Sequence, residues 1–494
     1  MALTNETPNA DQLLTHFGYK SEYRREIKRF ASFAVGFSFI SITTGIFSTY
    51  GSVLGWGGPL GIWTWPFVAL GQLFVALVFA ALASRIPLAG YSYQWASRLT
   101  NPKIGWLLGW ISFMFLIVVT VSVDYSISST VLPSLFNYTE TPLNAWGVTA
   151  LIVLIQMLLI IFSTVWSTRI NNVAVGTEVV GIVGLTLLLI IVGAVRGLLH
   201  TEHVFSMGLV PANGYFNLGS WNATGPFMLS FLLGSYTIVG FEAAANLAEE
   251  TENAHKVVPF AMWSAVVLSG VVGFVFLIAL NLASGDLKAL GASATPVADI
   301  VRGTLGSVIG SIFLVLVTFS IFACGLVIFI TATRLTWAMS RDRRFPGHML
   351  FSRVNEHTGT PVAATILLGV LIEVVLAIFA NQTNSLISLF SASSLLPAVI
   401  YLATVILYVF TRNKLPSSQA FKLGPFEWPI VVLAIIWLVF ELAIFRDAQF
   451  ATPWLYSGIM FVIGLIYFVW MLVSPAKVLE TLPESTTPEP ETVV

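Results

Sequence analysis

The sequence predicts an all-α membrane protein that crosses the bilayer many times. Of its 494 residues, 56% are hydrophobic and only 10% are charged, whereas ordinary soluble domains carry roughly 25% charged residues. Apolar runs long enough to span a bilayer recur along most of the chain, so the lipid bilayer is the expected surrounding for their side chains. This composition excludes a soluble globular protein. The net charge of -1 provides no basic excess for nucleic acid, which we exclude as a partner.

Twelve runs of mainly apolar residues reach the roughly 20 residues that a membrane-spanning helix needs. They are expected to be helices, because open strand edges cannot be satisfied in hydrocarbon and the runs are too long and too uniformly apolar for barrel strands. We number them spans 1 to 12. They cover residues 30 to 52, 62 to 84, 106 to 132, 145 to 166, 173 to 196, 225 to 248, 258 to 283, 306 to 338, 362 to 380, 386 to 410, 427 to 446 and 453 to 473.

The distribution of Lys and Arg predicts which way the spans are oriented. Of the 23 basic residues, 19 lie in or near the two chain ends and the loops that follow even-numbered spans, and 4 lie in or near the other loops. Because cytoplasmic loops are enriched in Lys and Arg, we expect a multi-pass protein of the cell membrane with both termini in the cytoplasm. The polar start of the chain lacks a signal-peptide pattern, so span 1 is expected to direct insertion.

Small and polar residues interrupt two spans at equivalent places in the two halves of the chain. They are Ser41, Thr43, Thr44 and Gly45 in span 1, and Gly234, Gly240 and Glu242 in span 6. Such residues can simply allow helices to pack closely, but their coincidence favours two discontinuous helices with a ligand site between them. Gly45 and Gly240 are predicted to lie where the helices break. Because spans 1 and 6 are five apart, the second half is inverted relative to the first, which predicts a five-plus-five inverted repeat followed by spans 11 and 12.

The predicted breaks would free backbone groups inside the membrane. N–H groups at the start of a half-helix suit a carboxylate, and C=O groups at the end of the other half-helix suit an ammonium group or a small cation. A zwitterion can thus be held without a buried arginine. This agrees with the sequence, because no Lys or Arg lies at the centre of any predicted span.

Asp124, Glu178, Glu242 and Glu441 are acidic residues that lie inside predicted spans. Each costs about 2.5 to 3.5 kcal/mol at a helix centre, so each suggests a functional site. Desolvation disfavours the ionised form, and these carboxyl groups could therefore carry protons. Glu242, beside the break, is favoured as functional and Glu178 as a group for proton or cation coupling. For Asp124, helix packing and contact with a ligand amine remain alternatives, and for Glu441 helix packing or an oligomer contact is favoured.

Two aromatic residues flank the predicted break of span 6. Tyr236 and Phe241 could cover a bound ammonium group through cation–π contact and close over a ligand, although core packing is the alternative. Enzyme motifs are weak: the six histidines include no pair at metal-ligand spacing on one helix, and no phosphate-binding loop is present. We therefore expect no enzyme activity, cofactor or metal site.

Four segments resemble the amino acid, polyamine and organocation transporter superfamily and, within it, the amino acid/choline transporter family. The resemblance covers Phe30 to about Val473. Its motifs are GFEAAANLAEETENAHKVVP at 240–259, TATRLTWAMSRDRRFPG at 331–347, RIPLAGYSYQWA at 85–96, and the region from TTGIFSTYG to GGP in and after span 1.

The resemblance implies a five-plus-five inverted-repeat fold and secondary transport of small amines or amino acids. It implies that the amides of Thr44, Gly45 and Ile46 face the substrate carboxylate, that the segment 236–240 faces the amine, and that Tyr236 is an aromatic lid. Thr43 and Thr44 stand where many relatives have a glycine-rich trio. The expected substrate-binding residues are Thr43, Thr44, Gly45, Ile46, Tyr236, Ile238, Gly240, Phe241 and Glu242.

Glu178 departs from the family pattern. It stands where some relatives have a membrane-embedded lysine that replaces a sodium ion and changes protonation during the cycle. A carboxylate there could carry a proton, bind Na⁺ or pair with the substrate cation, and these alternatives stay open. The candidates for ion coupling are Glu178, Glu242 and Asp124.

We expect a proton-coupled permease for an amino acid, a γ-aminobutyrate-like amine or a choline-like amine. An amine exchanger is an alternative, and so is a nutrient sensor without transport, although tails of about 29 and 21 residues argue against a sensor. A channel is disfavoured because no span shows repeated polar rings. The expected parts are a cytoplasmic segment at 1–29, a transport core at 30–410, spans 11 and 12 at 411–473 and a disordered cytoplasmic tail at 474–494. The oligomeric state stays open.

Overall fold

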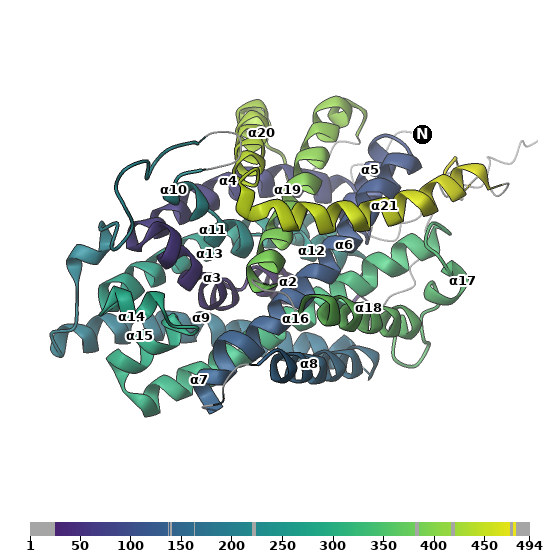
Figure 1. Ribbon diagram of the computed structural model, residues 1–494. Coiled ribbons are helices and arrows are strands. Elements are labelled where there is room, and N and C mark those ends of the chain that lie inside the picture. The colour runs from purple at the N-terminus through teal and green to yellow at the C-terminus, as the bar shows by residue number, and fades with distance from the viewer. Residues whose placement is uncertain are drawn as a thin grey trace, which may run out of the picture.

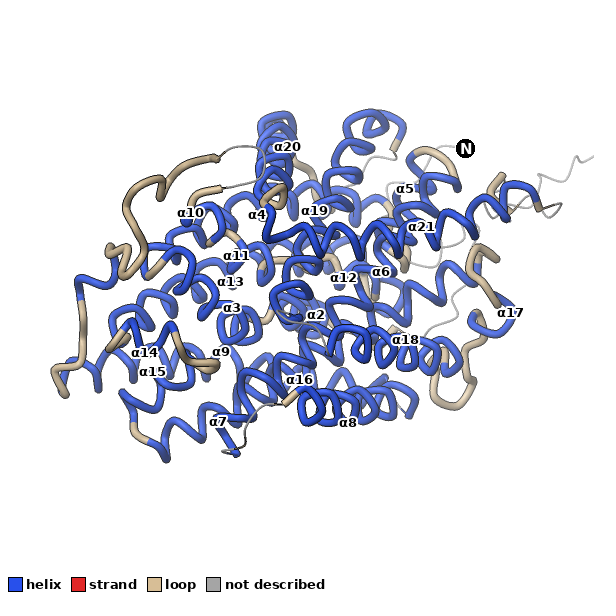
Figure 2. Tube along the Cα trace, in the orientation of Figure 1, coloured by secondary structure: helices blue, strands red, loops and turns tan. Residues whose placement is uncertain are grey.

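The computed structural model describes residues 25–136, 138, 141–162, 164–219, 224–380, 385–415, 420–474 and 478–480. Most of the predicted segment 1–29 and of the predicted tail 474–494 therefore lies outside the described residues. The described chain folds into helices and loops (Figure 2). Its β-type pairing is a single bridge between Ile27 and Thr251. The predicted all-α fold is confirmed.

Eleven helices of the described chain are long and apolar enough to cross a membrane, and they correspond to spans 1 to 5 and 7 to 12. They are α2 (Arg29–Ile40) with α3 (Ile42–Gly57), α4 (Thr64–Arg85), α6 (Pro102–Ser126), α8 (Pro142–Phe162), α9 (Thr164–Val195), α13 (Ala254–Ala283), α16 (Ser307–Arg341), α18 (Val362–Ala380), α19 (Ser385–Thr411), α20 (Glu427–Ile444) and α21 (Ala451–Val473). Between α6 and α8 the chain continues through η2 (Ile127–Val131), a π-helical turn, and α7 (Leu132–Phe136).

Span 6 is not among the eleven because it is divided into short pieces. These are α10 (Pro226–Leu229), α11 (Leu232–Thr237), α12 (Ala243–Asn246) and η4 (Ala248–Glu250). Gly240 lies between α11 and α12 with a φ of 80°, a conformation that glycine adopts readily. The predicted interruption of span 6 is thus observed, while the twelve-span count and the inverted repeat remain predictions.

Span 1 is interrupted at Ser41, four residues before Gly45. Ser41 has φ 36° and ψ 94°, and its side chain accepts a hydrogen bond from the Thr44 N–H at 3.3 Å. Serine is a favoured N-cap residue, so α3 begins directly after it and Gly45 lies within that helix. The prediction that Gly45 lies at the break is therefore wrong. The glycine and proline run at 55–59 ends α3 at Gly57 and opens the short helix η1 (Pro59–Trp63).

The broken helices lie at the centre of the bundle. In the span formed by α2 and α3, 89% of the most apolar window is buried, whereas the value for the last span is 11%. Figure 1 shows α2, α3, α11 and α12 in the middle of the molecule, with α21 across its outside. Exposed apolar side chains on the outer helices, such as Val462 and Ile466, suit a lipid surrounding.

The two ends of the bundle differ in charge and in structure. We call the end that carries Arg334, Arg341 and Arg344 the basic end; it includes α5 (Tyr91–Leu99) and α17 (His348–Phe351). The opposite end includes η3 (Thr201–Val204), α14 (Leu287–Gly291) and α15 (Pro296–Leu305). In Figure 1, α17 lies at the right and α14 and α15 at the left.

Candidate functional site

Glu178 of α9 binds the break in span 1. Its Oε1 accepts hydrogen bonds from the Ser41 hydroxyl at 3.0 Å, the Thr43 N–H at 3.0 Å and the Thr43 hydroxyl at 2.8 Å. Its side chain is buried. A carboxylate at this place meets the positive end of the α3 dipole and its first N–H groups. Glu178 thus fills the kind of anion position that such a break creates.

The amides expected to bind a substrate carboxylate have partners within the chain. The Thr44 N–H donates to the Ser41 hydroxyl at 3.3 Å, and the Gly45 N–H donates to the Ser41 carbonyl at 3.1 Å. Ile46 lies inside the regular part of α3. The role of these three residues in substrate binding stays a prediction.

Gly45 and Gly240 bring the two broken spans against each other. A β-carbon on Gly45 would overlap the side chain of Thr237 on α11, and one on Gly240 would overlap the Phe39 ring on α2. Each glycine therefore allows the backbone of one broken span to approach a side chain of the other. Close approach of this kind is where the absence of a side chain matters most.

Tyr401 of α19 joins the break of span 6 to Glu242. Its hydroxyl accepts a hydrogen bond from the Gly240 N–H at 2.9 Å and donates to Glu242 Oε2 at 2.6 Å. The Phe241 ring packs against the Tyr401 ring, with centroids 5.3 Å apart. Ile238, three residues before Phe241, is fully buried. Tyr401 is not among the residues expected from the sequence, because span 10 contains several hydroxyl-bearing residues and nothing in the sequence distinguishes this one.

Tyr236 lies behind a cavity that faces the opposite end. Its hydroxyl is 3.1 Å from the Ser122 hydroxyl of α6, and its ring centroid is 4.5 Å from that of Phe390 on α19. Phe390 lines a cavity of about 390 Å³ together with Phe47, Ser48, Tyr125, Thr130 and Pro296. Tyr236 thus packs against a ring that lines the cavity without lining it itself. Neither Ser122 nor Phe390 is among the residues expected from the sequence.

Asp124 contacts a different group of helices. Its Oδ1 accepts a hydrogen bond at 2.8 Å from the Gln156 side chain of α8, and that amide also donates to the Phe322 carbonyl of α16. Gly325 of α16 leaves the room for this pair. Asp124 is fully buried at this three-helix contact, which favours its packing role over contact with a ligand amine.

Glu441 of α20 lies in the interior of the chain. Its Oε2 is 3.3 Å from the Gln72 amide nitrogen of α4, and the Ser235 hydroxyl of α11 lies within reach of its carboxyl group. Only 1% of Glu441 is exposed. Glu441 thus packs span 11 against spans 2 and 6, in keeping with the helix-packing role expected for it.

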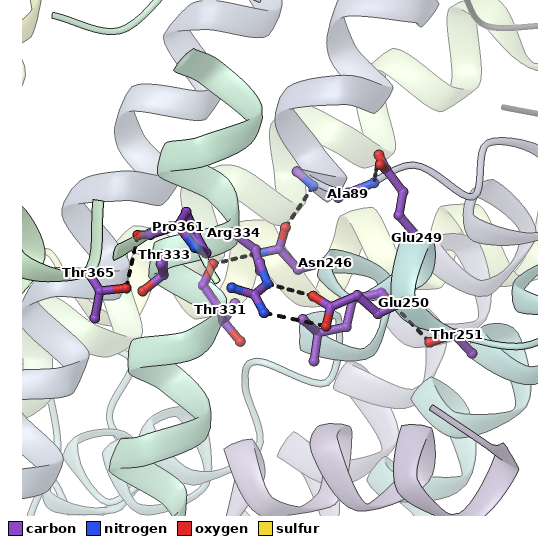
Figure 3. Close-up of polar contacts among 12 residues, drawn as sticks. Ala89, Asn246, Glu249, Glu250, Thr251, Thr331, Thr333, Arg334, Pro361 and Thr365 are labelled. Atoms are coloured by element: carbon purple, nitrogen blue, oxygen red, sulfur yellow. Dashed lines mark hydrogen bonds and ion pairs between the residues drawn. The ribbon is translucent and has the colours of Figure 1, made fainter. Parts of the chain in front are cut away.

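Two ion pairs lie at the basic end, and Figure 3 shows the one between Arg334 and Glu250. Arg334 of α16 contacts both carboxylate oxygens of Glu250, at 2.5 and 3.4 Å. Arg341, seven residues further along α16, contacts both carboxylate oxygens of Glu249 at 2.9 and 3.0 Å. Arg334 and both glutamates are buried, so these are paired charges of the kind that a protein interior requires.

Further hydrogen bonds tie the same segment to the rest of the basic end. Asn246 of α12 accepts from the Gly90 N–H at 2.7 Å and donates to the Thr331 carbonyl at 2.7 Å, as Figure 3 shows in part. Glu249 also accepts from the Ala89 N–H at 3.0 Å. Three of the motifs that carry the family resemblance meet here. Their sequences give no indication of this pairing, which joins residues more than 80 positions apart.

Broken central helices, buried carboxyl groups and eleven apolar helices define a multi-pass membrane protein of the transporter type. The family model for amino acid permeases matches residues 27–469, and the chain therefore belongs to that family. The resemblance to the amino acid, polyamine and organocation superfamily is confirmed. Membership indicates a transporter rather than an enzyme.

Similar proteins from plants and fungi carry permease names. Amino-acid permease BAT1 of Arabidopsis thaliana is 27% identical over 453 residues, which cover 86% of this chain and 86% of that protein. Amino-acid permease 2 of Neurospora crassa is 25% identical over 458 residues, covering 90% and 82%. The GABA-specific permease of Saccharomyces cerevisiae is 27% identical over 371 residues, covering 72% and 64%.

Proposed function

We propose that this permease is a secondary active transporter that moves a small amino acid or amine by alternating access, driven by a proton gradient. The observation that carries the proposal is the contact of Glu178 with the break of span 1, at Ser41 and Thr43. A titratable carboxyl group is there directly connected to the part of the fold that is expected to face substrate. The names of similar proteins make amino acids and γ-aminobutyrate the first substrates to test.

The substrate is proposed to bind between the two breaks. The residues expected to contact it are Thr43, Thr44, Gly45 and Ile46 of span 1 and Tyr236, Ile238, Gly240, Phe241 and Glu242 of span 6. The positions of Tyr236 and Phe390 support a lid, because Tyr236 packs against a ring that lines the cavity. A substrate ammonium group would then be covered by aromatic rings, which attract cations.

Proton binding at Glu178 is proposed to change the break itself. An ionised carboxylate accepts the three hydrogen bonds from Ser41 and Thr43 more strongly than a neutral acid does. Protonation therefore weakens the contacts that hold α3 in its present position relative to α9. Because a ligand changes a conformational equilibrium only through its different affinity for the two states, this difference is what can couple the proton to transport.

The two ends of the bundle support alternating access. The cavity reaches the opposite end, whereas the ion pairs of Glu249 and Glu250 hold the basic end closed. We propose that the basic end faces the cytoplasm of the cell, in keeping with the distribution of Lys and Arg. Release of substrate to that side requires both ion pairs to separate while the cavity closes.

Uptake by purified protein in proteoliposomes tests the proposal. The substrates are labelled amino acids, γ-aminobutyrate and choline, each with a pH gradient, with a Na⁺ gradient and with neither. We expect accumulation of at least one substrate that depends on the pH gradient. Accumulation that follows only the Na⁺ gradient would show that Na⁺, not H⁺, is the coupling ion. Uptake only into vesicles preloaded with an amine would show that the protein is an exchanger and not a symporter. No uptake of any substrate would contradict transport and favour a sensor.

A further inference from the structure

Three potential metal ligands meet in the loop between spans 5 and 6. His200 precedes η3, and Glu202 and His203 lie within it, at the opposite end of the bundle. The potential ligand atoms of these three residues all lie within 4.8 Å of one another. His200 Nδ1 and Glu202 Oε1 are 3.2 Å apart. Two ligand atoms on one tetrahedral zinc ion, each about 2.0 to 2.1 Å from the metal, are roughly 3.3 Å apart.

His203 is oriented as a metal-binding histidine is. Its Nδ1 lies 3.0 Å from the Ser284 carbonyl and 2.9 Å from the Ser284 hydroxyl, at the end of α13. Because a carbonyl oxygen only accepts, Nδ1 carries the proton and the lone pair of the neutral ring is on Nε2. Metal-binding histidines commonly donate their other ring N–H to a backbone carbonyl in this way, which fixes both tautomer and ring direction.

The other two ligands are also prepared for a cation. The carboxylate Oε1 of Glu202 lies 3.2 Å from His200 Nδ1, and a carboxylate oxygen is an ordinary zinc ligand. The rings of His200 and His203 are stacked, with centroids 5.0 Å apart and planes at 19°, so the two imidazoles are close neighbours.

The backbone of the loop is held in place by the membrane helices. The His200 N–H donates to the Leu282 carbonyl at 2.7 Å, and the Asn281 side chain donates to the His203 carbonyl at 3.3 Å. The Trp63 ring, at the end of η1, donates to the Val204 carbonyl at 2.9 Å. Ligands carried by a fixed backbone lose little freedom when they bind an ion.

We propose that His200, Glu202 and His203 form a binding site for a divalent transition metal, best suited to Zn²⁺, with water as the fourth ligand. Two imidazole nitrogens and one carboxylate oxygen are a common zinc ligand set. No metal site is expected from histidine pairs at metal-ligand spacing on one helix, because the ligands here lie in a tight turn at positions 200, 202 and 203. The site is independent of the proposed substrate.

Zinc binding to the full chain in detergent tests the proposal. We expect isothermal titration with Zn²⁺ to give one ion per chain, and His200→Ala and His203→Ala each to weaken binding by on the order of 10- to 100-fold or more. His357→Ala, an exposed histidine at the basic end, is the matched control and should bind as the wild type does. X-ray absorption should give zinc–nitrogen distances of about 2.0 to 2.1 Å.

A second readout separates a lost site from a misfolded variant. Zn²⁺ should raise the melting temperature of the wild-type chain and of His357→Ala, because an ion that binds only the folded state stabilises it. The same addition should not raise the melting temperature of the double variant His200→Ala/His203→Ala, which should still unfold in one cooperative transition without zinc. Equal zinc affinity in the double variant, or no zinc binding by the wild-type chain, would overturn the proposal.

Discussion

Gly45 of span 1 lies directly against Thr237 of span 6, so that a β-carbon at residue 45 has no space beside the threonine side chain. This contact joins α3 to α11, the helical pieces on either side of the expected substrate position. A corresponding contact joins Gly240 to Phe39. The two broken spans are therefore fitted to each other through a pair of glycines.

Substitution of Gly45 tests this fit. Gly45→Ala is expected to destabilise the chain by about 1 to 3 kcal/mol, the range for overfilling a packed interior, and to abolish most substrate binding. Thr237→Ala in the same chain removes the two outer atoms of the threonine side chain and should restore part of both losses. Thermal unfolding and substrate binding measure the two effects. Gly55→Ala in the same helix, with no neighbouring atom within 4 Å, is the control. Wild-type behaviour of Gly45→Ala would show that the contact is dispensable.

Tyr236 is expected to act through its ring and its hydroxyl separately. Tyr236→Ala removes the contact with Phe390 and any cation–π contact, and should weaken apparent substrate affinity by about 1 to 2 kcal/mol. Tyr236→Phe keeps the ring but loses the hydrogen bond to Ser122, so its affinity should fall less. Uptake measured over a range of substrate concentrations gives both values. If both variants keep the substrate affinity of the wild type, Tyr236 is not part of the substrate site.

The ion pair of Arg334 and Glu250 is expected to stabilise the closed basic end. Removal of one partner of a buried pair costs about 3 to 5 kcal/mol in the state that buries the other, so Arg334→Gln should favour opening. A cysteine introduced at Thr331, whose carbonyl is bound by Asn246, should then react faster with a water-soluble maleimide.

The reversed pair Arg334→Glu/Glu250→Arg provides the check on this explanation. If charge pairing holds the basic end closed, the cysteine in the double variant should react more slowly than it does in Arg334→Glu or Glu250→Arg alone. Labelling rates in the three variants that do not differ from wild type would show that the pair does not control access.

The sequence predicts the interrupted spans well because small and acidic residues are conspicuous in apolar helices. It misplaces the break in span 1, since the local capping of α3 by Ser41 decides where the helix restarts and Gly45 is needed for packing instead. It also places the start of span 5 at residue 173, whereas α9 begins at Thr164. Polar residues such as Asn171 continue that helix beyond its apolar part.

Contacts between distant spans are the part of the site that the sequence does not predict. Tyr401 and Ser122 come from spans 10 and 3, and which side of a membrane helix faces the centre depends on its neighbours. The same holds for Glu250 and Arg334, whose motifs are recognisable but whose pairing needs the fold. Glu178 is predicted as a coupling group, and its hydrogen bonds to Ser41 and Thr43 are found only in the structure.

Glu178→Gln gives the most direct test of the central claim, that this carboxyl group couples a proton to substrate movement. The amide keeps the shape and an oxygen acceptor for Ser41 and Thr43, but it cannot titrate. Accumulation driven by a pH gradient and substrate exchange at equal pH should be measured in the same proteoliposomes, with Asp124→Asn as the control. The account predicts that accumulation is lost in Glu178→Gln while exchange continues, and that Asp124→Asn retains both. Undiminished accumulation in Glu178→Gln, or equal loss of accumulation and exchange, would contradict it.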